Sequence, residues 1–333
     1  MSTPLMQPPK SVKDLARKTQ QDITFDVPVS GHNFESDMDL QEFIKYFSNT
    51  GFQATNIGLA IKEIEKMKNS KIFFGCTSNI ISSGLRDIIK YLIKNKFIQV
   101  FCTTGGGIEE DIIKTFNPTF LASFNIKGSH LRDSGYNRIG NLVIPNENYE
   151  IFEKWLVSLV DEITEGYSPE NPLILTPSKL IKIFGEKINH QDSILYWASK
   201  NGINIYCPGI TDGSIGDILT FHPKRECLKL DVIEDIYNLN REAFFQKSTG
   251  AIILGCGIIK HQILNANLFR NGLDFCVLVN TAEEYNGSDA GASIEEAISW
   301  GKVVPDNTAV KIFGDATIIF PILVAGSFYK QNK

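Results

Sequence analysis

Apolar residues gather into six short runs that longer amphipathic stretches separate. The runs are nearly continuous in apolar residues and occupy residues 71–76, 98–104, 203–208, 250–257, 275–281 and 310–316. Strands that are buried on both faces of a parallel sheet have this pattern. Helix-length segments such as 82–96 and 258–272 lie between the runs. The alternation predicts an α/β fold with a doubly wound, mostly parallel, Rossmann-like sheet flanked by helices.

The first 26 residues differ from the rest of the chain, because they are polar and contain several prolines. A short amphipathic helix is compatible with part of this stretch, so we expect an N-terminal helical arm over residues 1–26. From residue 27 to residue 333 no repeat, low-complexity tract or linker interrupts the pattern. We therefore predict a single α/β domain over 27–333.

Composition narrows the class of protein. The chain has 333 residues, of which 43% are hydrophobic and 21% are charged, and this balance is typical of a globular protein. The net charge of −5 argues against a nucleic-acid partner. No run of 18 apolar residues predicts a membrane span, and the N-terminus lacks the apolar core of a signal peptide. The six cysteines form no CxxC pair, which favours reduced core thiols and a cytoplasmic location.

The ends of the predicted strands carry the candidate chemistry, because ligands of open parallel sheets bind beyond the carboxyl ends of the strands. Five of the six ends are rich in Gly, Ser, Thr, Asp or Glu. Such loops suit the phosphates of a dinucleotide, but they also serve as ordinary turns and helix caps. The standard GxGxxG fingerprint is incomplete at both Gly105 and Gly255. On these residues alone, a nicotinamide dinucleotide is one possibility.

Acidic residues cluster in the same loops and predict a cationic ligand. They are Glu109, Glu110, Asp212, Asp217, Asp289, Glu295 and Glu296. A metal ion or a polyamine would satisfy them, but no metal-ligand spacing such as HExxH is present, so we predict no metal site. Each acid also has a local explanation as a cap or solvated charge. For Glu296 that explanation is a capping box with Ser293.

Two further residues have both a local and a chemical interpretation. Lys302 follows Gly301, which is placed to end a helix, so Lys302 has the position of an ordinary lysine beyond a helix terminus. A nucleophilic role would require its pKa to be lowered by desolvation or by neighbouring cations. His261 begins the helix that follows a glycine-rich strand end. It is either a packing or capping residue or a general base.

Taken together, the loops resemble those of one family, deoxyhypusine synthase. The resemblance rests on nine blocks in family order between about residue 27 and residue 330: TSNIISSG, TTGGGIEEDIIK, RIGNLVIPNENY, TPSKLI, TDGSIGD, IKHQILNANLFRNGLDF, GSDAG, EEAISWGK and GDATIIFP. The family's enzymes transfer a hydride from spermidine to NAD, and an enzyme lysine then takes up the aminobutyl group as an imine. The group passes to a lysine of eukaryotic translation initiation factor 5A, and NADH reduces it to deoxyhypusine.

The resemblance also implies roles for individual residues. Lys302 matches the imine-forming lysine and His261 the proposed general base. The residues that match polyamine contacts or lie in the same blocks are Glu109, Asp217, Asn265, Gly287, Ser288, Asp289, Glu296 and Trp300. The residues that match NAD contacts are Ser78, Asn79, Ser82, Thr104, Gly106, Glu110, Asp212, Thr281, Ala282, Asp315 and Ala316. The family forms a homotetramer whose active sites lie at dimer interfaces, and an N-terminal helix can cover a neighbour's site.

Four positions depart from the family pattern. Cys256 replaces a glycine near the expected cofactor, Leu278 replaces a substrate-pocket tyrosine, Ala290 replaces a serine and Gln262 replaces a histidine. Two alternatives therefore stay open at this point. One is homospermidine synthase, which uses putrescine as the acceptor, and the other is a weakly active paralogue that serves as a subunit of a hetero-tetramer.

Overall fold

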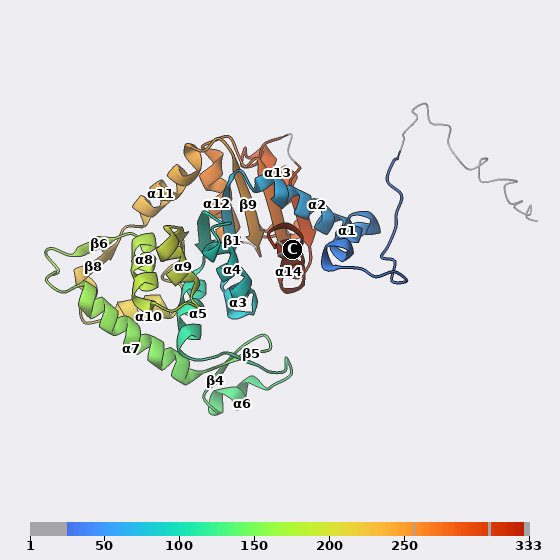
Figure 1. The fold of residues 1–333 in the computed structure, drawn as a ribbon. Coiled ribbons are helices and arrows are strands. Elements are labelled where there is room, and N and C mark those ends of the chain that lie inside the picture. The colour runs from blue at the N-terminus through green and yellow to red at the C-terminus, as the bar shows by residue number, and fades with distance from the viewer. Residues whose placement is uncertain (1–24, 256, 306–307, 330–333) are drawn as a thin grey trace, which may run out of the picture.

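The computed structural model describes residues 25–255, 257–305 and 308–329. A six-stranded parallel sheet forms its centre (Figure 1). The strands are β1 (Lys71–Cys76), β2 (Val100–Thr103), β7 (Asn204–Tyr206), β9 (Thr249–Leu254), β10 (Phe275–Asn280) and β11 (Val310–Phe313). Each strand overlaps one of the six apolar runs, with β9 beginning one residue before its run, so the predicted strands and the parallel sheet are confirmed. The predicted N-terminal arm falls almost wholly outside the described residues.

The order of the strands identifies where a ligand is expected. The sheet runs β11-β10-β9-β1-β2-β7, and every neighbouring pair is parallel. In chain order this is the 3-2-1-4-5-6 arrangement of dinucleotide-binding folds. The direction of winding reverses between β1 and β9, where Gly75 pairs with Ile253. A crevice is expected beyond the carboxyl ends of these two strands.

Helices cover both faces of the sheet. They are α1 (Leu40–Thr50), α2 (Phe52–Met67), α3 (Ser78–Ser82), α4 (Leu85–Lys94), α5 (Gly105–Phe116), α6 (Gly128–Asp133), α7 (Asn146–Ile163), α8 (Pro177–Ile188), α9 (Ile194–Asn201), α10 (Ser214–Phe221), α11 (Val232–Phe244), α12 (Ile258–Leu268), α13 (Ile294–Ser299) and α14 (Ala316–Ser327). Single 3₁₀ turns occur at η2 (Arg225–Cys227) and η3 (Glu284–Asn286).

Two hydrophobic cores result from the alternation of side chains along the strands. Phe73 of β1 joins the core under α11 and α12, together with Leu239 and Ile263. Its neighbour Phe74 joins the opposite core, where its ring lies 5.5 Å from that of Phe320 in α14. The near-continuous apolar runs thus supply both cores at once, as the sequence pattern predicted.

Smaller elements flank the sheet. An antiparallel sheet contains β3 (Phe120–Leu121), β5 (Leu142–Pro145) and β4 (Tyr136–Ile139), and a parallel pair contains β6 (Leu173–Leu175) and β8 (Leu228–Leu230). The five described cysteines are free and buried, while Cys256 lies outside the described residues. Over the described ranges, no helix combines the length and apolar character that a membrane span requires.

Candidate functional site

A cavity of about 860 Å³ gathers seven of the residues singled out from the sequence. It lies among α11, α12, α13 and the loop before α13. The seven are His261, Asn265, Gly287, Asp289, Glu296, Trp300 and Lys302. Apolar side chains such as Ile236, Leu239 and Leu264 form much of the remaining wall. The cavity therefore combines an apolar surface with two carboxylates and the side chains of two lysines, Lys260 and Lys302.

His261 and Asn265 lie one turn apart on α12 and so share a face of the helix. The side-chain amide nitrogen of Asn265 lies 3.0 Å from Nδ1 of the His261 ring. Because α12 begins directly after β9, this helix leads from the point where the sheet reverses its winding into the cavity wall. The hydrogen bond fixes the orientation of the imidazole at that wall.

The backbone around Lys302 is held on both sides. Gly301 has φ +72°, and it ends α13 in a Schellman motif: its N–H donates to Ile298 O at 2.8 Å, and the Lys302 N–H donates to Ala297 O at 2.9 Å. The Lys302 carbonyl accepts from the Leu273 N–H at 2.9 Å. The predicted helix-ending glycine is confirmed, and its turn directs the chain so that Lys302 lines the cavity.

The short helix α13 presents an acid and an aromatic ring beside this lysine. Ser293 caps the helix, accepting from the Glu296 N–H at 3.3 Å, and this bond is one half of the predicted capping box. The Glu296 carboxylate lies in the cavity wall. Four residues on, the Trp300 ring is 65% exposed, and the Lys302 ammonium lies 5.6 Å from its centroid. Among the described contacts, the cap uses the backbone N–H of Glu296 and not its carboxylate, so the carboxylate is left for a chemical role in the cavity.

Two acceptor atoms in the cavity wall have no protein donor. Oδ2 of Asp289 and Oε1 of Gln262 are buried, and no hydrogen-bond partner for either occurs among the described residues. Buried acceptors are nearly always satisfied in folded proteins, so these two atoms indicate a donor that comes from a ligand or solvent. Ser288 lies next to Asp289 in the same loop and is exposed.

The loops after β1 and β2 approach each other closely. The backbone N–H of Ser78 donates to Oγ1 of Thr104 at 3.1 Å. A Cβ on Gly106 would lie 3.0 Å from the Cβ of Ser78, so a larger residue would crowd this contact. Asn79 is exposed beside them. On the other side of the reversal point, Gly255 follows β9 with φ +80°, a conformation that favours glycine.

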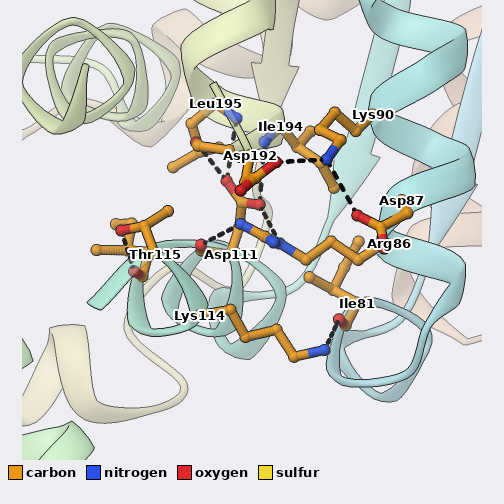
Figure 2. A network of polar contacts seen from close by, with 12 residues as sticks. Ile81, Arg86, Asp87, Lys90, Asp111, Lys114, Thr115, Asp192, Ile194 and Leu195 are labelled. Carbon is orange, nitrogen blue, oxygen red and sulfur yellow. Dashed lines mark hydrogen bonds and ion pairs between the residues drawn. The ribbon is translucent and has the colours of Figure 1, made fainter. Parts of the chain in front are cut away.

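Three consecutive acids of α5 have three different environments, and the third is structural. Asp111 accepts from Nε of Arg86 at 2.7 Å, from the Ser193 hydroxyl at 2.6 Å and from the N–H groups of Ile194 and Leu195. Figure 2 shows how this carboxylate joins α4, α5 and the start of α9. Asp111 therefore fixes the helix on which Glu109 and Glu110 stand.

Glu110 is buried and half satisfied. Its side chain lies beneath the loops after β1 and β2, 4% exposed, and Oε1 accepts from the Tyr149 hydroxyl at 3.2 Å. No partner for Oε2 occurs among the described residues. Burial raises the pKa of Glu110, although the Tyr149 hydroxyl, the Lys114 charge and the nearby Ser82 hydroxyl oppose the shift.

Glu109 and Asp217 lie apart from the large cavity. Glu109 accepts from the Ile215 N–H at 2.7 Å in the first turn of α10, and burial raises its pKa. Asp217 lines a second cavity of about 340 Å³ with Tyr149 and Glu153. Within one chain, these two acids do not join the acids of the large cavity.

The remaining residues implied for a cofactor lie at the carboxyl ends of the strands. Asp315 caps α14 by accepting from the Thr317 N–H at 2.7 Å, and Ala316 starts that helix. Thr281 and Ala282 directly follow β10. Asp212 is exposed in the loop before α10, and Ser82 ends α3 with 2% exposure.

Leu278 corrects one expectation. It is 1% exposed in β10 and packs in the core under α11 and α12, so it does not contribute to the cavity wall. Sequence reasoning also missed Lys260 and Lys311, whose ammonium groups bind the loop before α13. A lysine beside His261 gave the only local signal. The contribution of α11 to the wall gave no local signal, because its wall residues Ile236 and Leu239 lie more than twenty positions before His261.

Comparisons with known proteins agree with the resemblance in the loops. The family model described as "Deoxyhypusine synthase" matches residues 42–327. A deoxyhypusine synthase of Encephalitozoon cuniculi is 58% identical, covering 98% of both chains, and that of Senecio vernalis is 46% identical, covering 92% of this chain and 90% of the relative. A crystal structure assigned to deoxyhypusine synthase of Entamoeba histolytica superposes with a TM-score of 0.68 at 31% identity, covering 90% of this chain and 96% of that one.

Proposed function

Since the chain belongs to the deoxyhypusine synthase family, we propose that it transfers the aminobutyl group of spermidine, through Lys302, to one lysine of the precursor of eukaryotic translation initiation factor 5A. The observation that carries this proposal is the large cavity, where Lys302 meets His261, Glu296 and Trp300. The relatives named above are all deoxyhypusine synthases, which favours this function over homospermidine synthesis.

The cavity suits a linear polyamine. Apolar side chains contact methylene groups, and carboxylates at Asp289 and Glu296 bind the ammonium groups. The Trp300 ring offers a face to a cation. The unpartnered Oδ2 of Asp289 supports this assignment, since an ammonium group supplies the missing donor.

The roles of the two catalytic residues follow from their chemistry. His261 accepts the proton of the secondary amine of spermidine as the adjacent carbon gives up its hydride, and the Lys302 amine then adds to the carbon of the resulting C=N bond. Loss of 1,3-diaminopropane then leaves the four-carbon unit as an imine on Lys302. The acceptor lysine displaces Lys302 from that carbon in the same manner, so the enzyme amine is regenerated. The rigid backbone of Lys302 restricts its amine to this wall of the cavity.

NAD fits the residues at the strand ends. The strand order, the close approach at Gly106 and the twelve-residue helix α5 suit a pyrophosphate, and the free oxygen of Glu110 suits a ribose hydroxyl. Ser78, Asn79, Ser82, Thr104, Asp212, Thr281, Ala282, Asp315 and Ala316 would complete the site. When bound, NAD supplies the hydride acceptor of the first stage and the hydride donor of the last.

The assembly of the active site is part of the proposal. Asp217 and Glu109 lie apart from the large cavity of their own chain, so we assign them to a site that is completed across a dimer interface of a homotetramer. Residues 1–26 would then be the arm that covers a neighbour's site. A paralogous subunit would serve equally as the second copy. We expect the enzyme to act in the cytoplasm.

The decisive experiment incubates full-length protein with NAD, spermidine and the acceptor factor, followed by mass spectrometry of the factor. Wild type adds one aminobutyl group, and Lys302→Ala adds none while it still binds NAD. Putrescine supplied in competition tests the alternative acceptor. No transfer by well-folded wild type, alone or with a paralogue, would overturn the proposal, and preferential use of putrescine would replace it.

A further inference from the structure

The loop that precedes α13 carries Gly287, Asp289 and Ser293 into the cavity wall, and both its own turns and donors from other elements hold it. Inside the loop, the Gly291 N–H donates to Ser288 O at 3.1 Å, and the Ala292 N–H donates to Asp289 O at 3.3 Å. These two turns leave the carbonyls of residues 289, 291 and 292 within reach of donors from outside the loop. Two lysines from separate elements bind those carbonyls.

Lys260 is the more buried of the two. It stands on α12 beside His261 and is 1% exposed. Its ammonium donates to the carbonyl of Asp289 and, at 3.3 Å, to the carbonyl of Ala292. A buried ammonium is costly unless it is hydrogen-bonded, and a methionine would fill the same space without that cost. The presence of a lysine in this place therefore indicates that its bonds to the loop matter.

Lys311 approaches the same loop from the sheet. It lies on β11, and its ammonium donates to the carbonyl of Gly291. Gly291 is itself packed tightly, because a Cβ there would lie 1.7 Å from Glu283 O. The loop is thus bound at residues 289, 291 and 292 by two charged donors from α12 and β11.

The consequence for Asp289 is specific. Lys260 binds the main-chain carbonyl of Asp289, while the Oδ2 atom of the side chain is buried without a partner among the described residues. Burial lowers the pKa of Lys260, whereas the Asp289 charge opposes that shift. The ammonium and the carboxylate are close enough to interact, but the ammonium donates its hydrogen bonds to carbonyls and leaves this oxygen free.

We propose that Lys260 and Lys311 form a two-lysine clamp that positions the Asp289 carboxylate for an ammonium group of the substrate. The clamp rests on the proposed function, since spermidine is the amine that it would serve. Lys260 also lines the cavity, but its ammonium, like that of Lys311, donates to carbonyls of the loop. Both lysines are therefore positioning residues, which act on the substrate through the loop. In the clamped loop, Asp289 needs no reorganisation when the amine enters, which lowers the cost of binding.

The first test needs no substrate. Hydrogen exchange of the full-length protein is measured for wild type, Lys260→Met and Lys311→Met. Faster exchange at the amides of Gly291 and Ala292 in both variants is expected, with unchanged exchange in β1 and β9. Lys229→Met, an exposed lysine of β8, is the surface control. Unchanged exchange of the loop in both clamp variants would overturn the proposal, whether or not the protein has the proposed activity.

The second test measures steady-state kinetics. Loss of a hydrogen bond to a charged group predicts that Lys260→Met raises the KM for spermidine by roughly tenfold, and Lys311→Met by less. NAD affinity should stay within about twofold of wild type. Lys260→Met combined with Asp289→Asn should be no worse than Asp289→Asn alone, because the lysine acts through that acid. Additive effects, or a parallel loss of NAD affinity, would contradict the clamp.

A matched control exists at the cofactor loops. Lys114 of α5 donates to the carbonyls of Ile81 and Ser83 at the end of α3, so it is also a lysine that binds a loop through its carbonyls. Lys114→Met should weaken NAD binding and leave exchange at Gly291 unchanged. If wild type itself lacks activity toward spermidine, the proposed function fails, while the exchange experiment still decides whether the clamp exists.

Discussion

The Lys302 ammonium lies 5.6 Å from the centroid of the Trp300 ring, and both side chains line one cavity. The ring is two positions before the lysine, and the left-handed turn at Gly301 is what places them on the same wall. A ring in this position favours a cation, whether the cation is Lys302 itself or an ammonium group of the substrate.

Replacement of Trp300 should therefore weaken polyamine binding. We expect Trp300→Leu to raise the KM for spermidine by about 3- to 30-fold, the range of a cation–π contact. Trp300→Phe keeps an aromatic ring, so its KM for spermidine should lie between the values of wild type and Trp300→Leu. Steady-state kinetics at saturating NAD measures both variants. Equal KM values for wild type and Trp300→Leu would show that the ring has no part in binding.

The left-handed turn at Gly301 should matter more for activity than for stability. Any side chain at φ +72° costs about 1–2 kcal/mol, so Gly301→Ala should lower the free energy of unfolding by that amount. Gly202→Ala is the matched control, because Gly202 ends α9 with φ +70° and does not line the large cavity. Denaturant unfolding should give similar losses for the two, while only Gly301→Ala loses transfer activity.

The charged carboxylate of Glu110 should lower the stability of the protein when no cofactor is bound. Burial raises the pKa of Glu110 in the folded protein above its value in the unfolded chain. Stability linked to this group is therefore fully present at a pH below the unfolded-state pKa, and it is lost as the pH rises through the folded-state pKa. Glu110→Gln should thus raise the Tm of the apoprotein at pH 8 by roughly 1–3 °C. The gain should shrink as pH falls toward 5.

The same variant should bind NAD more weakly, because the free oxygen of Glu110 is proposed to accept a ribose hydroxyl. Thermal unfolding with and without NAD measures both effects. Two outcomes would refute this account of Glu110. One is a Glu110→Gln protein that is less stable than wild type at pH 8, and the other is an increase in Tm on addition of NAD that is as large in Glu110→Gln as in wild type.

The ion pair between Arg86 and Asp111 should be the most sensitive polar contact near the cofactor loops (Figure 2). Asp111→Ala removes the carboxylate partner of the buried Arg86 charge and of the Ser193 hydroxyl, and leaves the guanidinium only the main-chain carbonyl of residue 111, so we expect a loss of about 3–5 kcal/mol in unfolding free energy. Glu65→Ala, which removes an exposed pair with Lys68 at 3.9 Å, should cost less than about 1 kcal/mol. Chemical denaturation compares the two.

Sequence pattern was sufficient for the sheet, because strands buried on both faces must be apolar at nearly every position. All six strands of the parallel sheet coincide with predicted runs to within one residue at their starts, except β2, which begins slightly further inside its run. The helix end at Gly301 and the cap at Ser293 were also predictable, since each depends on residues within six positions. The order of the strands could not be predicted from the sequence, because it depends on which strands pair across long crossovers.

For the site, the loop motifs determined the family and singled out Lys302 and His261. Only the tertiary structure decided which of those residues share a cavity, because α11, α12 and α13 meet there from separate parts of the chain. It moved Leu278 from the expected pocket into the core, since its strand is covered on both faces. It also revealed Lys260 and Lys311, whose partners are main-chain carbonyls. A carbonyl belongs to every residue type, so no sequence pattern marks such a contact in advance.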